Sequence, residues 1–179
     1  MVESTEVNGR AERYDIRGNA IDKYVKEQGE FLRERISEMI EDNPDIKDKS
    51  KKDLIYVISP FKNVADKLAK ELDKIGFTRY DENNKCTNVG IVHTFQGKEA
   101  AIVFMVLGAD TRSTGAAYWA VGSDNPNIMN VATTRAEEEF YIIGDKQLYM
   151  NLNSDVINNT SKIINLFNKW MASTNVDNR

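Results

Sequence analysis

Short, uninterrupted apolar runs alternate along the chain with longer segments whose apolar residues recur at helical spacing. The uninterrupted runs read as strands buried on both faces, and they cover residues 54–58, 89–92, 101–107 and 140–143. The helical pattern covers residues 19–41, 62–75, 126–138, 145–152 and 155–170. Because strands and helices alternate, the pattern predicts an α/β domain with a mainly parallel sheet flanked by helices.

The segments between these elements are polar. Residues 1–18 are expected to form an extended or poorly ordered lead-in, followed by a single domain over 19–172. Gly76 is expected to end the second helix, as glycine often does. Residues 109–125 are rich in Gly, Ser, Thr and Asp and predict a long loop, and long loops in compact domains are often functional.

Composition narrows the class of protein. A chain of 179 residues, 41% hydrophobic and 29% charged, suits one globular domain, and no apolar run approaches the roughly 18 residues that span a bilayer. One cysteine, Cys86, and one histidine, His93, form neither an internal disulfide nor a structural metal site, so we expect a reducing, cytoplasmic compartment. The net charge of −4 does not indicate nucleic-acid binding, which usually requires a basic surface, but it is compatible with a few local phosphate contacts.

Ligands of such folds bind at the carboxyl ends of the strands. Three segments are expected there: residues 59–62, residues 93–99 and the loop after Leu107. In the second, Gly97 would let backbone approach a ligand, free N–H groups beside a helix start would favour an anion, and Glu99 would accept hydrogen bonds from a sugar. The residue types alone fit an ordinary solvated surface turn equally well.

A second candidate is Arg135, near the end of a helix of small residues. Arginine suits phosphate because its guanidinium offers a flat fork of donors and keeps its charge, and in phosphoryl transfer an arginine from another domain can stabilise the transition state. The competing interpretation is an arginine paired with a neighbouring glutamate. The available partners are Glu137, Glu138 and Glu139.

Together the two segments resemble motifs of superfamily 1 helicases, in the branch that translocates 5′ to 3′. The string His-x-Phe-Gln-Gly-Lys-Glu within 89–100 is similar to motif V, and 128–136 is similar to motif VI. Ser59-Pro60-Phe61 matches a short Ser/Thr-Pro-aromatic segment of that family, and the resemblance covers about residues 50–150. It implies a RecA-like domain of the P-loop-NTPase type, the second motor domain of a helicase.

The resemblance also implies roles for the matched residues. Arg135 would be the arginine finger on the γ-phosphate. The nucleotide would contact Gln96, Gly97, Lys98 and Glu99. Gln96 would also couple the nucleotide site to the site that binds the nucleic-acid strand. Single-stranded DNA or RNA would contact Phe61, Lys62, His93 and Thr94. ATP and Mg²⁺ would be shared with an N-terminal RecA-like domain of the same polypeptide, the domain's main partner besides nucleic acid.

Two positions depart from the family pattern. Motif V usually has a Ser or Thr where this chain has Ile91, so one phosphate contact is lost, and a basic residue usually follows motif VI where this chain has Glu137. We expect Glu137 to point to solvent. No Gly-Lys-Ser/Thr triplet of a phosphate loop occurs in the sequence, so we expect that loop upstream and little or no ATPase from this chain alone.

Two other readings compete with a motor domain. A non-catalytic RecA-like module that binds nucleic acid or protein would need no ATP. A Rossmann-type enzyme would need a Gly-x-Gly-x-x-Gly turn after its first strand, which the sequence lacks. Tyr118 and Trp119, in the predicted long loop, could stack on bases or pack against the domain.

Overall fold

The computed structural model describes residues 10–121 and 126–152, and five parallel strands form its main sheet in the order β1-β7-β6-β4-β5. The strands are β1 (Arg10–Asp15), β4 (Ile55–Ser59), β5 (Val89–Ile91), β6 (Ala100–Val106) and β7 (Ala136–Gly144). A separate antiparallel pair joins β2 (Ala20–Ile21) to β3 (Tyr24–Val25). The α/β class and the mainly parallel sheet expected from the sequence are confirmed.

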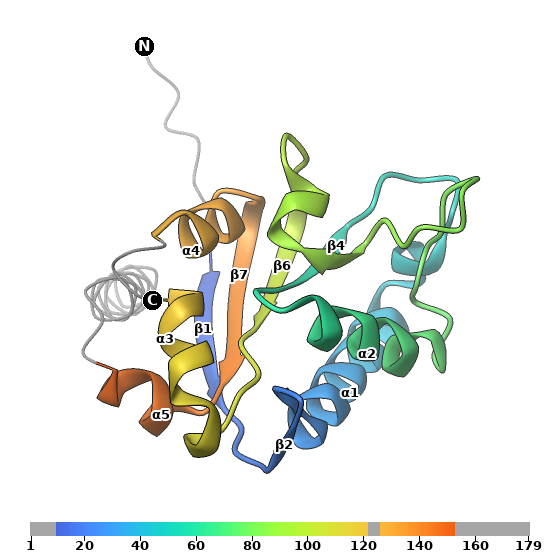
Figure 1. Ribbon diagram of the computed structural model, residues 1–179. Coiled ribbons are helices and arrows are strands. Elements are labelled where there is room, and N and C mark those ends of the chain that lie inside the picture. The colour runs from blue at the N-terminus through green and yellow to red at the C-terminus, as the bar shows by residue number, and fades with distance from the viewer. Residues whose placement is uncertain (1–9, 122–125, 153–179) are drawn as a thin grey trace, which may run out of the picture.

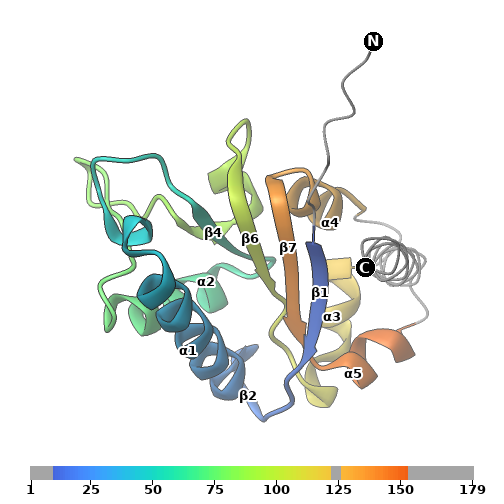
Figure 2. The same cartoon turned by 180° about the vertical axis from the view of Figure 1, so that it is seen from behind.

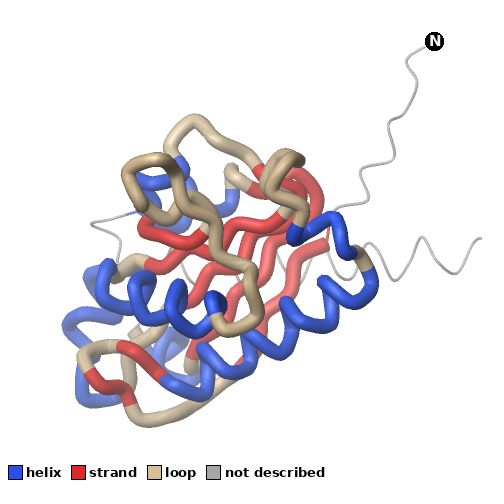
Figure 3. The backbone as a smooth tube through the Cα atoms, turned by 90° about the vertical axis from the view of Figure 1, so that its right-hand side faces the viewer, coloured by secondary structure: helices blue, strands red, loops and turns tan. Residues whose placement is uncertain are grey.

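Helices cover both faces of this sheet. They are α1 (Lys26–Asp42), α2 (Lys62–Asp73), α3 (Thr114–Val121), α4 (Pro126–Thr133) and α5 (Lys146–Asn151). Short 3-10 turns are η1 (Pro44–Lys47), η2 (Val92–Phe95) and η3 (Thr111–Ser113). Figure 1 shows α3, α4 and α5 beside β1 and β7 on the near side, Figure 2 shows α1 on the opposite side, and Figure 3 shows the strands as one twisted layer.

Chain direction explains why the helices divide between the faces. The connections from β1 to β4 and from β4 to β5 run toward one edge of the sheet, whereas those from β5 to β6 and from β6 to β7 run back. Right-handed crossovers that run in opposite directions place their helices on opposite faces. The direction of the chain across the sheet therefore reverses after β5, the outermost strand, and the residues that follow it must pass β4 to reach β6.

Apolar side chains from both faces make one core around the sheet. Every residue of β4 is buried, which is why its sequence shows no polar alternation. Phe104 on β6 and Tyr141 on β7 stack with ring centroids 4.9 Å apart. The largest fully buried side chains besides these two include Phe95, Leu32, Ile36, Ile58, Leu68 and Met129.

The polar lead-in expected over residues 1–18 contributes an edge strand. Residues Arg10–Asp15 form β1, which pairs in parallel with β7 from Arg10 beside Glu139 to Asp15 beside Gly144. Its residues are only partly buried, because an edge strand has solvent on one side, so it lacks the apolar run that marks β4 and β6. The first helix accordingly begins at Lys26, after the small hairpin, and not at residue 19.

Two further boundaries differ from those expected. The helix predicted over 126–138 ends at Thr133, and Ala136 already belongs to β7. The three glutamates that follow Ala136 favour a helix in sequence, but they lie on the outer part of β7, which is not buried in the core. The long loop predicted over 109–125 contains α3, whose alanines favour a helix. The helix predicted over 155–170 and the domain end at 172 lie outside the described residues.

The chain turns sharply after β6, and residues of the β2–β3 hairpin and of α1 are hydrogen-bonded to this turn. The Gly108 N–H donates to the Gln28 side chain at 3.0 Å, and the Ala109 N–H donates to the Lys23 carbonyl at 2.7 Å. The Tyr149 hydroxyl donates to the Leu107 carbonyl at 3.0 Å. Gly108 has φ +62°, and a Cβ there would lie 2.6 Å from the Lys23 carbonyl oxygen, so only glycine fits.

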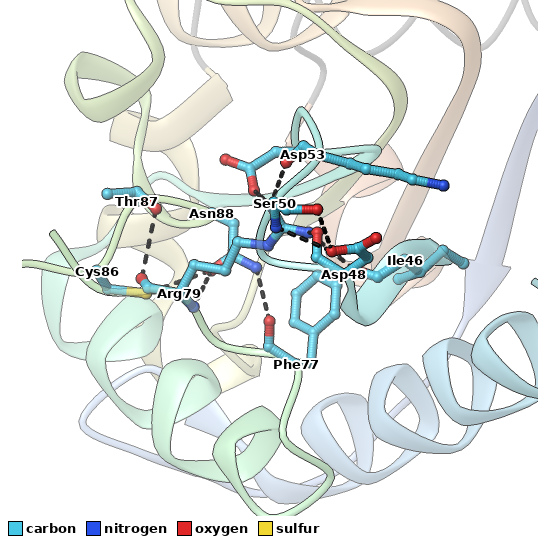
Figure 4. A network of polar contacts seen from close by, with 10 residues as sticks. Ile46, Asp48, Ser50, Asp53, Phe77, Arg79, Cys86, Thr87 and Asn88 are labelled. Atoms are coloured by element: carbon cyan, nitrogen blue, oxygen red, sulfur yellow. Dashed lines mark hydrogen bonds and ion pairs between the residues drawn. The ribbon is translucent and has the colours of Figure 1, made fainter. Parts of the chain in front are cut away.

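Arg79 joins the two loops that lead into β4 and β5, as Figure 4 shows. Its guanidinium lies 2.8 Å from the Asp53 carboxylate and donates to three main-chain carbonyls at 2.8–3.1 Å, those of Ile46, Asp48 and Lys51. The buried Asn88 side chain accepts from the Arg79 main-chain N–H at 2.9 Å. Because Asn88 directly precedes β5, this network fixes where β5 and the segment after it begin.

We expect Gly108→Ala to lower the free energy of unfolding by about 1–3 kcal/mol, because alanine is strained at a positive φ and its Cβ meets a carbonyl oxygen. Urea unfolding of the purified chain measures the effect. The matched control is Gly115→Ala within α3, where an added Cβ meets no atom within 4 Å and the change should be neutral or slightly stabilising. Equal midpoints for the two variants would contradict the strain at Gly108.

Candidate functional site

The segment between β5 and β6 crosses the sheet from the end where the parallel strands finish to the end where they start. We call these two ends the carboxyl edge and the amino edge of the sheet. The segment leaves the carboxyl end of β5 at Ile91, passes through η2, turns at Gly97 and enters the amino end of β6 at Ala100, beside Ala136 of β7. Only its first part lies at the carboxyl edge, so the expectation that residues 93–99 all lie there is wrong. The reason is geometric: β6 runs parallel to β5, so the chain must return to the amino edge before β6 can start.

The turn before β6 is not a helix start. It leads into a strand, the Lys98 N–H donates to the Phe95 carbonyl at 3.0 Å and the Ala100 N–H donates to the Arg135 carbonyl at 3.0 Å. The anion site expected from free N–H groups at a helix N-terminus is therefore not formed here. Gly97 has φ +75° with no atom within 4 Å of an added Cβ, so this glycine serves the turn and leaves open space outside it.

Arg135 lies in the turn between α4 and β7, directly against this segment. Its side chain donates to the carbonyls of Val131 and Lys98, each at 3.2 Å, and to the Thr134 hydroxyl at 3.1 Å. Among the residues that the structure describes, no carboxylate forms an ion pair with it. The glutamate pairing considered from the sequence is thus not what holds this arginine.

The neighbouring glutamates have other contacts. Glu137 is exposed and does not pair with Arg135, as expected, and its carboxylate lies 3.3 Å from the Lys52 ammonium. Glu139 accepts from the Tyr141 hydroxyl. Arg135 lies in the turn before β7, where its side chain bonds to main-chain carbonyls and a hydroxyl and not to these glutamates.

Cationic side chains gather at the amino edge of the sheet. Lys52, Lys98 and Arg135 precede β4, β6 and β7, which are neighbours in the sheet. Figure 1 shows the turn before β6 and the start of β7 at the same end of the sheet, next to α4. Gln96, Lys98 and Glu99 are exposed there. Lys52 is paired with Glu137, so Arg135 is the cation here that keeps donors for an anion, with Glu99 available as an acceptor for hydroxyl groups.

The residues matched to nucleic-acid contacts lie at the opposite, carboxyl edge. A groove of about 310 Å³, here called the histidine groove, is lined by Lys62 at the start of α2 and by His93 and Thr94 of η2. Gly90 makes room for Thr94, because a Cβ at Gly90 would lie 2.6 Å from its hydroxyl oxygen. The structure thus brings these residues together and keeps them apart from the Gln96–Glu99 turn and Arg135.

Some lining residues were not singled out from the sequence as site residues. Lys85 and Cys86 line the histidine groove, and Lys23 and Trp119 line a second groove beside it, together with Phe61. Of these, only Trp119 carried a signal, as an aromatic residue in a predicted loop. Among the described residues no group of three His, Cys, Asp or Glu side chains is placed to hold a metal ion, and no helix is long and apolar enough to cross a membrane.

Comparison with known proteins identifies a family for the chain. A protein family described as an AAA domain matches residues 9–147. The chain belongs to this family and is a helicase C-terminal domain of the superfamily 1, RecA-like type. Its structure is similar to that of the C-terminal domain of a possible DNA helicase from Lactobacillus plantarum, with 12% identity, a TM-score of 0.48 and 83% of each chain covered. No curated protein matches the chain in sequence.

The alkylation rate of Cys86 reports whether the lining of the histidine groove is folded, because this residue is part of the lining. Burial raises the pKa of its thiol, so the thiolate is scarcer at a given pH than in an ordinary cysteine. We expect iodoacetamide to alkylate the folded chain several-fold more slowly than the urea-unfolded chain at pH 8, and the rate to keep rising above the usual thiol pKa of about 8.5. Identical pH profiles for folded and unfolded chains would contradict the burial of Cys86.

Proposed function

We propose that this domain is the C-terminal motor domain of an ATP-dependent helicase and that its amino edge completes a nucleotide site with a second RecA-like domain. The observation that supports the proposal most is Arg135, a cation without a carboxylate partner among the described residues, placed against the Gly97–Lys98 turn. A guanidinium held by carbonyls and a hydroxyl keeps its full charge and has donors left for an anion. The phosphates of ATP are such an anion.

The family resemblance gives each residue of the amino edge a role in this proposal. The Arg135 guanidinium contacts the γ-phosphate as an arginine finger, using donors left after the three bonds it makes within the domain. Glu99 accepts hydrogen bonds from the ribose, and Gln96, Gly97 and Lys98 face the nucleotide. The phosphate loop and the acidic Mg²⁺ ligands belong to the other domain. When bound there, Mg²⁺ neutralises phosphate charge during hydrolysis.

The carboxyl edge is the proposed track for single-stranded nucleic acid. Lys62, His93 and Thr94 line one groove and can contact a phosphate backbone, and Phe61 lines the groove beside it. The short segment from His93 to Glu99 joins the two edges, with Gln96 between them. Nucleotide-dependent movement at one edge would therefore reach the other along a single stretch of main chain.

A non-catalytic module that binds nucleic acid without ATP is the alternative, and Ile91 is the observation that favours it. This residue lines both grooves at a position where the resembled motif has a hydroxyl. Glu137 no longer favours it, since its partner is Lys52 and not Arg135. The two functions differ in whether Arg135 matters for activity.

We expect Arg135→Ala to lower ATP turnover of the intact two-domain motor by about 10³-fold or more, as loss of an arginine finger does elsewhere. Steady-state ATP hydrolysis in the presence of single-stranded nucleic acid measures the effect. The 179-residue chain alone should hydrolyse little or no ATP, because its sequence has no phosphate loop.

Glu138→Ala is the matched control for this experiment, because Glu138 is an exposed neighbour on β7 without an assigned role. It should leave turnover unchanged. A loss of less than about tenfold for Arg135→Ala would rule out the finger assignment and favour the non-catalytic module.

We expect Lys62→Ala to weaken binding of a labelled single-stranded oligonucleotide and to reduce the slope of log K against log salt by about 0.7, the value for one phosphate contact on a single strand. The Lys62 ammonium now lies 2.9 Å from Asp66, but both groups are exposed, so this pair is weak and can be exchanged for a phosphate. Fluorescence anisotropy over a salt series measures both quantities.

Lys70→Ala is the control, because Lys70 has the same charge and lies two turns further along α2, away from the groove lining. Its slope should equal that of the unchanged chain. Equal slopes for all three proteins would remove Lys62 from the proposed track.

A further inference from the structure

One carboxylate lies among the cations of the histidine groove. Lys62, Lys85 and His93 line this groove, and Asp66 is the one acidic residue among the described residues that line it. Asp66 also lines the second groove, so it lies where the two grooves meet. A carboxylate at this place repels a polyanion and lowers the affinity of the proposed track for a nucleic-acid strand.

The Asp66 carboxylate is paired with Lys62, one helical turn earlier on α2. The Lys62 ammonium lies 2.9 Å from one carboxylate oxygen and 3.2 Å from the other, so it contacts both. The two side chains are 77% and 58% exposed. The ammonium of Lys62 is therefore occupied, but by a group that solvent and an incoming strand can reach.

Helix stability does not explain this pairing. Lys62 lies in the first turn of α2, where the helix dipole repels a cation. A lysine four residues before an acid is also the less favourable order for an ion pair on a helix. Lys70, four residues after Asp66, offers the better order, yet within the described part of the chain it forms no ion pair with Asp66. The exposed pair therefore contributes little to folding and is easily broken.

A phosphate group can take the place of the Asp66 carboxylate. Both are oxygen anions that accept hydrogen bonds from an ammonium. A phosphate at Lys62 also approaches the amino end of α2, where the N-cap residue, Phe61, has no side chain that could cap the first N–H groups. Within the described residues, Asp66 accepts hydrogen bonds from Lys62 alone. The phosphate thus gains contacts that the carboxylate does not make, which favours the exchange.

We propose that Asp66 is an internal competitor of the single strand for Lys62. Its carboxylate holds the ammonium while the groove is empty, a backbone phosphate displaces it on binding, and its return to Lys62 assists release. This inference rests on the proposed nucleic-acid track and adds to it a residue that limits how tightly the strand is held. A motor that moves along a strand must release it in every cycle, so such a limit suits the proposed function.

Binding of labelled oligothymidylate to the 179-residue chain at low salt tests the competition. We expect Asp66→Asn to tighten binding by about three- to tenfold, because a unit charge a few ångströms from the phosphate is removed. Asp66→Glu keeps the charge and should bind as the unchanged chain does. Glu41→Gln is the matched control: Glu41 is exposed near the end of α1, lines neither groove, and its substitution changes the net charge equally.

A double substitution separates competition for Lys62 from simple repulsion. If Asp66 acts through Lys62, Asp66→Asn should have little effect on affinity in a chain that already carries Lys62→Ala. If Asp66 only repels the strand, the gain in affinity should persist in the Lys62→Ala chain. Persistence of the full gain would overturn the inference.

The rate constants provide an independent measure. Competition for Lys62 should change dissociation, so a stopped-flow chase with unlabelled oligothymidylate should show Asp66→Asn releasing the strand about three- to tenfold more slowly. The association rate should be similar to that of the unchanged chain. A gain confined to the association rate would indicate long-range steering and would also contradict the competition.

The outcomes distinguish this inference from the proposed function. Equal affinity of Asp66→Asn and the unchanged chain, with binding observed for both, would overturn the role of Asp66 and leave the track intact. Absence of binding by every protein in the series would overturn both proposals.

Discussion

The connection from β5 to β6 is the constraint on which the rest of the site depends. Parallel strands oblige the chain to return to the opposite edge of the sheet, and here that return uses residues 92–99 without a full helix. Phe95 anchors the middle of the segment: it is fully buried, and its ring centroid lies 4.6 Å from that of Tyr56. His93 and Glu99 therefore lie on opposite edges although few residues separate them.

The two edges differ in how their charges are arranged. At the amino edge, Arg135 is held by main-chain carbonyls and a hydroxyl, which orient the guanidinium without neutralising it. At the carboxyl edge, by contrast, Lys23 is paired with Asp22 and Lys62 with Asp66. At the amino edge Lys52 is paired with Glu137, and Arg135 is the cation there for which the described residues supply no carboxylate partner. Under the proposed function, this difference suits the two edges to separate ligands.

The sequence predicted the strands that carry apolar runs, including β5 at one side of the sheet, and missed the polar strand β1 at the other side. Strands β4 and β6 were recognisable because burial leaves only apolar residues. Strand β1 was not, because Arg10–Asp15 is polar and forms only on pairing with β7, a contact distant in sequence. The candidate site residues were predicted by resemblance, but their division between two edges depends on the path of residues 92–99, which no local pattern encodes.

The position of β1 also bears on the order of folding. This strand comes first among the described elements, yet its hydrogen-bonding partner is the last strand, β7, with Arg10 beside Glu139. During synthesis the ribosome must release nearly the whole described domain before that pairing can form. Until then β7 has an open edge and the segment containing β1 has no template, so completion of the sheet is a late, long-range step.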